Sequence, residues 1–357
     1  MRVLFWVPYP TQGASNRYRI EQYLPSLESA GISYELRSFW CSKAYKLLYK
    51  EGNHFKKAYY FILGTFSRIW DLIFISKYEI VFIHREAYPI GGAFFETILS
   101  LFNKSIIFDF DDAIFFPVSS RPNNFVERLK RPSKVSAIIK ISQHVIAGNN
   151  YLANFALRYN GAVSVIPTPI DTDKYCLHYK KRNNEVIIGW MGSITTLSFL
   201  KMLENVFIGL SGKFNNIKFI IIGGYFSIDG LSNIVSKEWV LNREIEDLKT
   251  FDIGIMPMHE DEWTLGKCGF KAILYMSMGI PCVCSPVGVN KEIITDGLNG
   301  FLANTEKEWI DNISLLIESS QLRKNMGLEG RKKIEQDYSL KVNAPKFLQV
   351  IQQVYSV

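Results

Sequence analysis

The chain has 357 residues, of which 48% are hydrophobic and 21% are charged. This length is enough for two domains with separate cores, and the composition excludes a largely disordered protein. The net charge of +7 favours an acidic partner such as a phosphate group, an anionic lipid or a nucleic acid, although a basic soluble enzyme has the same charge.

The five cysteines are scattered, without a CxxC pair or a Cys/His cluster, so a structural zinc site is not expected. Cys282 and Cys284 flank one residue of an apolar run, and we expect them on opposite faces of a buried strand. The opening residues lack the long apolar core of a signal peptide. The expected location is therefore the reducing cytosol.

The first half opens with an apolar run, Val3 to Val7, which is typical of a buried parallel strand. A loop rich in Pro and Gly follows, and then a helix start. Because ligands of open α/β sheets bind in loops at the carboxyl ends of strands, Arg17 and Arg19 are candidate contacts for a phosphate or an acidic sugar. The alternative is that both arginines only lie on a helix surface.

A second strand is predicted at Ser33 to Phe39, and a basic segment rich in aromatic and leucine residues follows it from 43 to 75. Such a helix suits an anionic membrane surface, which makes that surface a candidate partner. Arg68 and Asp71 interrupt the segment too much for it to span a membrane. The alternative is a core helix with a solvated basic face. No nucleic-acid motif is present, so nucleic acid is not expected as a partner.

Polar residues follow the next two predicted strands. The strand from 80 to 83 ends at His84 and Arg85, which are candidate ligand contacts at the carboxyl end of a strand. The strand beginning at Ser105 runs into an acidic loop, where clustered carboxylates could bind a hard cation only with further oxygen ligands. In the alternative, one carboxylate caps the following helix and the others pair with basic side chains. The carboxylates are Asp109, Asp111 and Asp112.

A domain boundary is predicted where the apolar run from Val163 to Asp171 gives way to a polar segment, 172–185, which contains the charged run Lys180–Asn184. The second half begins with a strand at 186–191 and the turn Gly192-Ser193, where glycine lets the backbone approach a phosphate. Further strands at 217–222 and 252–257 alternate with helices, which indicates a second parallel, doubly wound sheet.

The segment from Trp263 to Phe301 carries the clearest signal of a binding site. Lys267 and Lys271 are four residues apart, so we expect both on one face of a helix. The turn Gly279-Ile280-Pro281 ends that helix, and a strand and a glycine loop follow. Two helix N-termini with cationic side chains at one sheet edge predict a site for a phosphorylated ligand.

This segment resembles the donor-sugar-binding segment of the glycosyltransferase family 4 group, which has the GT-B fold. The resemblance implies an α/β protein with two Rossmann-like, doubly wound domains that face a cleft, and a C-terminal helix that crosses back to the N-terminal domain. The implied domains are 1–172 for the acceptor, 173–338 for the nucleotide sugar and 339–357 for the final helix. The matching residues are Ser277–Pro281, Gly288, Glu292 and Asp296–Phe301.

The sequence departs from the family where two glutamates would stand, at Gly266 and Leu274. It looks like a branch that reads G-K-C-x-x-K, which implies Lys267 as the first candidate for the donor pyrophosphate and Lys271 as the second. Glu244 is then a candidate for the ribose. The full set of donor-binding candidates is Gly192, Ser193, Lys267, Lys271, Gly288, Val289, Asn290, Glu292 and Glu244.

The resemblance implies glycosyl transfer from a nucleotide sugar to a hydroxyl of a glycan or lipid-linked glycan, with retention and without a metal or other cofactor. Its catalytic candidates are Lys267, Asp111 and Asp112, and its candidate contacts for the acceptor are Arg17, Arg19, His84 and Arg85. We expect a role in bacterial surface polysaccharide synthesis, in the cytoplasm or at the inner face of the cell membrane. Two alternatives stay open: a nucleotide-sugar epimerase of the same fold, and a non-catalytic partner protein.

Overall fold

The computed structural model describes the chain except for residues 49, 51, 117–132, 179–184 and 357. The predicted charged run Lys180–Asn184 therefore lies outside the described residues. The described chain forms two compact units. The first comprises Met1–Pro169, Gly266–Cys268 and Leu340–Val357, and the second comprises Ile170–Leu265 and Gly269–Ser339.

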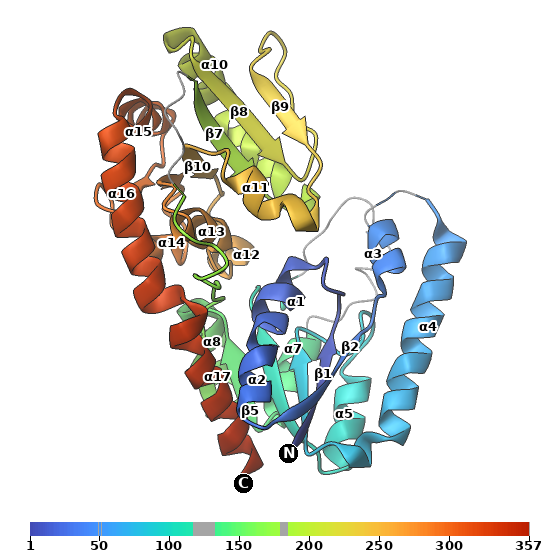
Figure 1. Cartoon of the computed structure of the whole chain (residues 1–357). Coiled ribbons are helices and arrows are strands. Elements are labelled where there is room, and N and C mark those ends of the chain that lie inside the picture. Colours follow the sequence, from blue (N-terminus) through green and yellow to red (C-terminus); the bar gives the residue numbers. More distant parts are fainter. Residues whose placement is uncertain (49, 51, 117–132, 179–184, 357) are drawn as a thin grey trace. The chain divides into compact units, whose positions relative to one another are not determined.

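The first unit is built on a parallel sheet in the order β2-β1-β3-β4-β5-β6 (Figure 1). Central strands such as β1 and β3 are almost wholly buried, as expected for a parallel sheet with helices on both faces. The strands are β1 (Arg2–Val7), β2 (Ser33–Ser38), β3 (Ile80–His84), β4 (Ser105–Phe110), β5 (His144–Ala147) and β6 (Val163–Val165).

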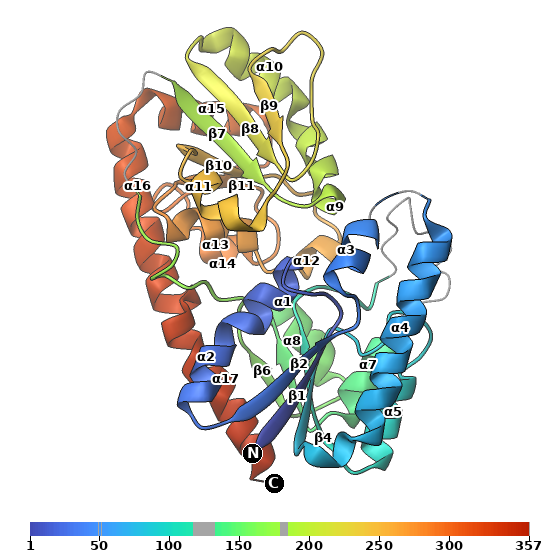
Figure 2. The ribbon, with the colours of Figure 1, turned by 45° about the vertical axis from the view of Figure 1, so that its right-hand side comes forward.

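The helices of the first unit follow the strands along the chain (Figure 2). The last of them, α17, packs on the core of this unit, where Phe347 stacks on Tyr23 with ring centroids 4.1 Å apart. The helices are α1 (Ala14–Arg19), α2 (Leu24–Ser29), α3 (Ser42–Leu48), α4 (His54–Ile73), α5 (Phe94–Leu101), α7 (Ser133–Ile141), α8 (Asn150–Leu157) and α17 (Leu340–Tyr355).

The second unit has its own parallel sheet, in the order β12-β11-β10-β7-β8-β9. The short edge strands β9 and β12 were not predicted, because neither has a long apolar run. The strands are β7 (Val186–Met191), β8 (Ile217–Ile222), β9 (Ile234–Lys237), β10 (Ile253–Met256), β11 (Cys282–Cys284) and β12 (Phe301–Leu302).

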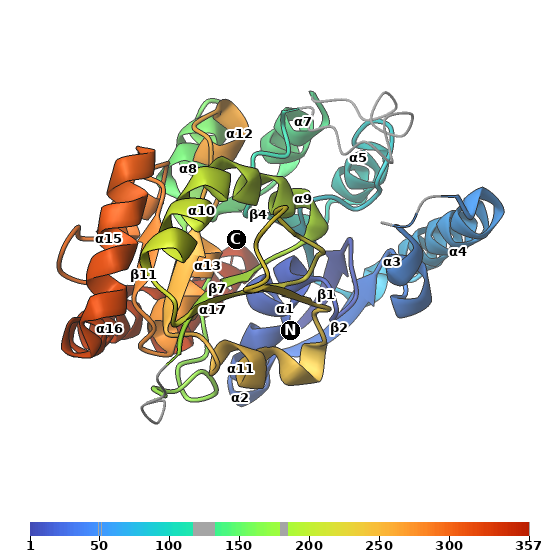
Figure 3. The same cartoon turned by 90° about the horizontal axis from the view of Figure 1, so that it is seen from above.

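Helices cover both faces of the second sheet, and α15 and α16 lie side by side (Figure 3). The α-helices are α9 (Ile194–Leu197), α10 (Glu204–Lys213), α11 (Glu244–Leu248), α12 (Glu262–Leu265), α13 (Phe270–Ser277), α14 (Asn290–Ile293), α15 (Glu306–Glu318) and α16 (Ser320–Lys333). Together with the first sheet, this arrangement confirms the prediction of two doubly wound α/β units.

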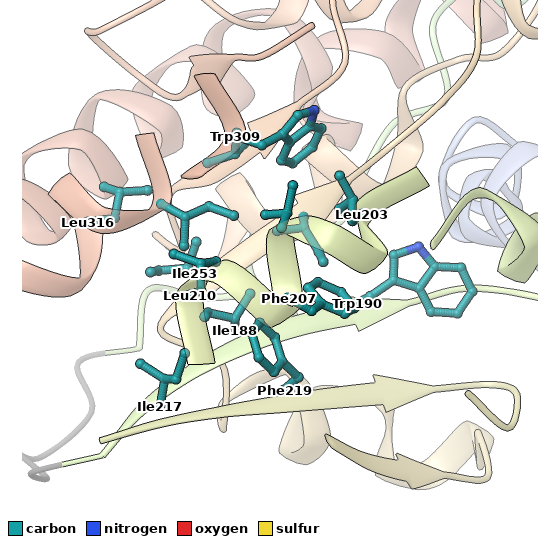
Figure 4. Close-up of a cluster of buried hydrophobic side chains, with 14 of the residues drawn as sticks. Ile188, Trp190, Leu203, Phe207, Leu210, Ile217, Phe219, Ile253, Trp309 and Leu316 are labelled. Carbon is teal, nitrogen blue, oxygen red and sulfur yellow. The ribbon is translucent and has the colours of Figure 1, made fainter. Parts of the chain in front are cut away.

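The core of the second unit joins the strands to α10 and α15 (Figure 4). Phe207 of α10 packs on Phe219 of β8 with ring centroids 4.4 Å apart. The helical run Ile194–Lys213 has the length and apolar composition of a membrane span. Leu203, Phe207 and Leu210 of this run belong to the core, whereas Ile194 and Ile208 are 61% and 47% exposed.

Two local predictions are wrong. Cys282 and Cys284 share one face of β11, with their Sγ atoms 3.7 Å apart, because side chains of a strand alternate and residues two apart point the same way. Lys267 does not share a helix with Lys271. Helix α13 begins at Phe270, after Gly269 in the left-handed region at φ 64°, and Lys267 lies in the preceding loop.

Candidate functional site

Asp109, near the carboxyl end of β4, is the centre of a buried polar network in the first unit. Its carboxylate forms an ion pair with the Arg19 guanidinium, and its Oδ2 lies 2.7 Å from Nδ1 of His84 on β3. Arg19 also donates to the carbonyl of Ile166 at 2.6 Å. Because the Arg19 side chain is 1% exposed and engaged internally, the structure gives it a structural role in place of the predicted acceptor contact.

The Asp109 carboxylate of this network is held in its ionised form by its neighbours. Burial favours a raised pKa for Asp109, but Arg19 and His84 outweigh it and the pKa lies below its ordinary value. An ionised carboxylate can only accept, so Nδ1 of His84 donates to it. Nε2 of His84 is buried, has no hydrogen-bond partner among the described residues and lies 4.0 Å from Oδ1 of Asp111. In a neutral ring this atom is an acceptor.

Arg85 follows β3 in a left-handed conformation, with φ 62°, which is unusual for a residue with a side chain and is common at functional sites. Its backbone N–H donates to the carbonyl of Asp109 at 2.7 Å, and its Nε donates to Oδ1 of Asp111 at 2.6 Å. Burial favours a raised pKa for Asp111, but Arg85 and His84 hold it well below the usual range. With its side chain 20% exposed, Arg85 remains a candidate ligand contact.

The other predicted acceptor contact, Arg17, is 8% exposed, and its Nη1 donates to the carbonyl of Thr11 at 3.1 Å. Its guanidinium also lies over the ring of Tyr18, 4.6 Å from the ring centroid. Arg17 therefore packs against its own helix and the preceding loop.

The three predicted catalytic residues come together in the first unit. Lys267 places Nζ 3.0 Å and 3.2 Å from the two carboxylate oxygens of Asp112. The Cys268 thiol donates to the carbonyl of Asp111 at 3.2 Å, and Asn149 donates its Nδ2–H to the carbonyl of Lys267 at 3.1 Å. Burial raises the pKa of Cys268 to about 12, so its thiol stays protonated. The segment 266–268 is thus bound to the ends of β4 and β5.

Sequence analysis gave Asp109 a role only in the alternative that carboxylates of the acidic loop pair with basic side chains, and its pairing with Arg19 agrees with that alternative. It assigned no role to Asn149 or Cys268. A signal was present for Asp109, because a carboxylate inside an apolar strand needs a buried cation. Asn149 and Cys268 have no such signal, since their roles depend on contacts distant in sequence. Among the described residues, no group of three or more His, Cys, Asp or Glu side chains is arranged to hold a metal ion. Arg19, Arg85 and Lys267 instead pair with the clustered carboxylates.

The predicted phosphate turn of the second unit lies at the end of β7. A Cβ atom on Gly223, whose φ is 101°, would overlap the carbonyl oxygen of Gly192, so the two turns fit only with a glycine at 223. Lys271 is the second residue of α13, and its side chain lies beside the turn. Its Cε is 2.8 Å from the position that a Cβ atom on Gly192 would occupy. Its Nζ lies 5.5 Å from the centroid of the Trp190 ring. Ser193 is exposed, and its hydroxyl lies 2.7 Å from that of Thr195.

The predicted glycine loop packs against the start of α13. A Cβ on Gly269 would lie 3.0 Å from Val289 and 3.1 Å from Oδ1 of Asn290. Asn290 is fully buried and donates Nδ2–H to the carbonyl of Ser285 at 3.0 Å, while its Oδ1 has no partner among the described residues. Gly288 has φ 51°. The structure thus brings Gly288, Val289 and Asn290 beside the helix that carries Lys271.

Two residues predicted to bind the nucleotide sugar, Glu244 and Glu292, lie in different surroundings. Glu244, at the start of α11, is 5% exposed; its Oε1 accepts from the Tyr175 hydroxyl at 2.6 Å and its Oε2 from the Trp239 indole at 2.8 Å. Both carboxylate oxygens of Glu244 therefore have internal donors, which gives this residue a structural role in the second unit. Glu292 is exposed on α14, which has only one turn.

The positions of the missing glutamates have clear physical constraints. Leu274 is 4% exposed within α13, where an isolated carboxylate would be costly. A Cβ on Gly266 would stand 2.5 Å from Cβ of Ala113. Neither position has room for an exposed glutamate side chain in this fold. This explains why the two glutamates are absent, but it does not identify the residues that replace them.

Comparisons with known proteins agree with this geometry. Residues 185–319 match the model of the family described as glycosyl transferases group 1. Comparison with curated protein sequences gave no match. The match covers the turn after β7 that is predicted to bind phosphate, and it also covers Lys271 and the glycine loop. The matched segment, 185–319, is thus similar to the sugar-transferring proteins of this family over most of the second unit.

Solved glycosyltransferases share the fold over the whole chain. A sucrose-phosphate synthase from Thermosynechococcus elongatus has 13% identity and a TM-score of 0.69, with 100% of this chain and 99% of that chain covered. A glycosyltransferase from Rickettsia africae has 17% identity and a TM-score of 0.68, with 99% and 98% covered. HepE from Anabaena, solved with UDP and glucose, has 12% identity and a TM-score of 0.68, with 99% and 100% covered. The GT-B prediction is confirmed.

Proposed function

We propose that this enzyme transfers a sugar from a nucleotide-diphosphate sugar to a hydroxyl of a glycan or lipid-linked glycan, in the cytoplasm, during bacterial surface polysaccharide synthesis. The observation that carries the proposal is the contact of Lys271 with the Gly192 turn, inside the segment that matches the family. HepE, which has the same fold, was solved with UDP and UDP-glucose, and this supports a nucleotide-sugar donor here.

The role assigned to Lys271 follows from the charge that develops in the reaction. As the bond between the anomeric carbon and the phosphate oxygen breaks, the diphosphate gains negative charge. A lysine ammonium and backbone N–H groups aimed at that charge stabilise it without a metal. Helix α13 provides such N–H groups in its first turn, and Gly192 lets the backbone come close. We assign the diphosphate to Lys271 and Gly192.

We further propose front-face transfer with retention. The acceptor oxygen bonds to the anomeric carbon while the bond to the diphosphate breaks, and the departing phosphate takes the acceptor proton. A double displacement needs a carboxylate nucleophile beside the anomeric carbon. Asp109, Asp111 and Asp112 are each engaged with a cation, which favours a positioning role for them.

The test is a thermal-shift panel of nucleotide sugars, with and without EDTA, on the wild type, Lys271→Ala and Lys307→Ala. Ligand binding raises the melting temperature by mass action. We expect one nucleotide sugar to stabilise the wild type and Lys307→Ala, whose side chain is 89% exposed on α15, but not Lys271→Ala. With that donor, Lys271→Ala should lower kcat by roughly 10²–10³, the cost of removing one charge-stabilising group.

Two results would overturn parts of the proposal. A requirement for a divalent cation would contradict the metal-free site, and an unchanged shift in Lys271→Ala would contradict the assignment of Lys271. Incubation of the donor alone separates transfer from epimerisation, because an epimerase changes the sugar without an acceptor. The anomeric configuration of the product, read by NMR, decides between retention and inversion.

A further inference from the structure

Helix α4 exposes a continuous apolar stripe to solvent. The helix has 20 residues and is therefore about 30 Å long. Figures 1 and 2 show it along one side of the first unit. Eight large apolar side chains on it are at least 44% exposed, which is far more than isolated exposed residues explain. They are Phe55, Tyr59, Ile62, Leu63, Phe66, Ile69, Trp70 and Ile73.

The charged side chains in the middle of α4 point inward instead. Arg68 is fully buried and donates to the carbonyl of Ala87 at 2.9 Å and to that of Val7 at 3.1 Å. Asp71 is 4% exposed and accepts from the indole of Trp6 at 2.9 Å. A helix on a water-exposed surface has the opposite arrangement. The alternative of a core helix with a solvated basic face is therefore wrong for α4.

The described charges near the stripe that reach solvent are positive. From 42 to 77, every described charged side chain that reaches solvent is a lysine. Two of these lysines are on α3, which packs against α4. The lysines are Lys43, Lys46, Lys50, Lys56, Lys57 and Lys77.

We propose that the α4 stripe lies in the interface of an anionic membrane, with its aromatic and aliphatic side chains among the acyl chains and the flanking lysines at the lipid phosphates. Large apolar residues with flanking lysines are the pattern of helices that lie in the membrane plane. A second copy fits less well, because a twofold contact pairs the patch with itself and sets lysines against lysines. The lipid surface offers the complementary charge.

The experiment measures flotation of the full chain with vesicles of phosphatidylcholine alone or mixed with phosphatidylglycerol. We expect strong binding to the anionic vesicles and weak binding to the neutral ones. The double variant Phe66→Glu/Trp70→Glu should lower the partition coefficient at least about tenfold, since it removes two anchors and adds two repelled charges. The control Leu157→Glu/Tyr225→Glu, at positions 53% and 80% exposed, adds the same charge elsewhere and should bind as the wild type does.

Two further measurements make the result decisive. The pair Lys43→Gln/Lys46→Gln should weaken anionic binding by about fivefold per lysine and leave neutral binding unchanged. Brominated lipid should quench Trp70, and Trp70→Phe should remove that quenching. Circular dichroism checks that each variant is folded. Binding to neither vesicle, or binding that Phe66→Glu/Trp70→Glu leaves intact, would overturn the proposal. A dimer in sedimentation velocity that this variant abolishes would assign the stripe to a second copy.

Discussion

The two units build their candidate sites in different ways. In the first, carboxylates at the end of β4 face arginine and lysine side chains, and most of these groups are buried. In the second, glycine turns shape the backbone, and one lysine from α13 lies beside them. The difference indicates that changes in the first network will mainly affect folding, whereas changes at the second will mainly affect geometry and ligand binding.

The largest effect on stability is expected from Asp109→Ala. It leaves the Arg19 guanidinium buried without its carboxylate, and breaking such a pair costs about 3–5 kcal/mol. The free energy of unfolding in urea measures it.

A double variant tests whether the unpaired charge causes this loss. The variant Arg19→Met/Asp109→Leu removes both charges, so it should be more stable than Asp109→Ala, because apolar replacement of a buried pair is often neutral. If both variants lose the same free energy, the ion pair is not the reason for the instability, and the contrast between the units weakens.

A smaller effect is expected from Gly223→Ala in the second unit. Both Gly223 and Gly230 have a positive φ, but only at Gly223 would a Cβ meet backbone, the carbonyl of Gly192. We expect Gly230→Ala to cost about 1 kcal/mol from its conformation alone, and Gly223→Ala to cost at least about 2 kcal/mol more and to weaken donor binding. Urea unfolding and the thermal-shift assay measure the two effects. Equal costs for the two variants would show that the contact between the turns has no energetic weight.

Much of the fold could be predicted because its strands are buried apolar runs. The runs at 3–7, 80–83 and 186–191 became central strands as expected, and α17 spans the predicted terminal helix. The edge strands β9 and β12 were missed, since half-exposed short strands carry little periodicity.

The candidate site could be predicted from the sequence where glycine residues shape the backbone. The glycines at 192 and 288 indicate breaks between elements by residue type alone. Gly288 lies in a turn with φ 51°, and Gly192 lies in the short link between β7 and α9. The placement of Lys267 was not predictable, because a left-handed Gly269 separates it from α13 and its partner Asp112 is 155 positions away in sequence. The burial of Arg19 and Glu244 also depends on distant segments. Long-range pairing of charges leaves no pattern in the local sequence.

The smallest expected effect concerns stability in acid. The pKa of folded Asp111 lies below its ordinary value of 3.8, because burial is outweighed by Arg85 and His84. Below about pH 4 the unfolded chain therefore binds more protons than the folded chain at this residue. Its contribution to stability is complete above that pH and is lost as the pH falls toward the folded pKa. When urea unfolding is measured from about pH 6 down to about pH 3, the free energy of unfolding should decline once the pH falls below about 4.

Asp111→Asn should be less stable than the wild type at neutral pH and should have a shallower decline in acid, with Asp109 keeping part of the slope. The matched control in the second unit is Glu308→Gln. The pKa of Glu308 is also lowered, by the backbone N–H groups of Asn304 and Thr305, but this carboxylate is fully exposed in a capping box. Its removal should leave the acid slope nearly unchanged. If Glu308→Gln flattens the slope as much as Asp111→Asn does, acid sensitivity does not reside in the buried network of the first unit, and the two units would differ in geometry alone.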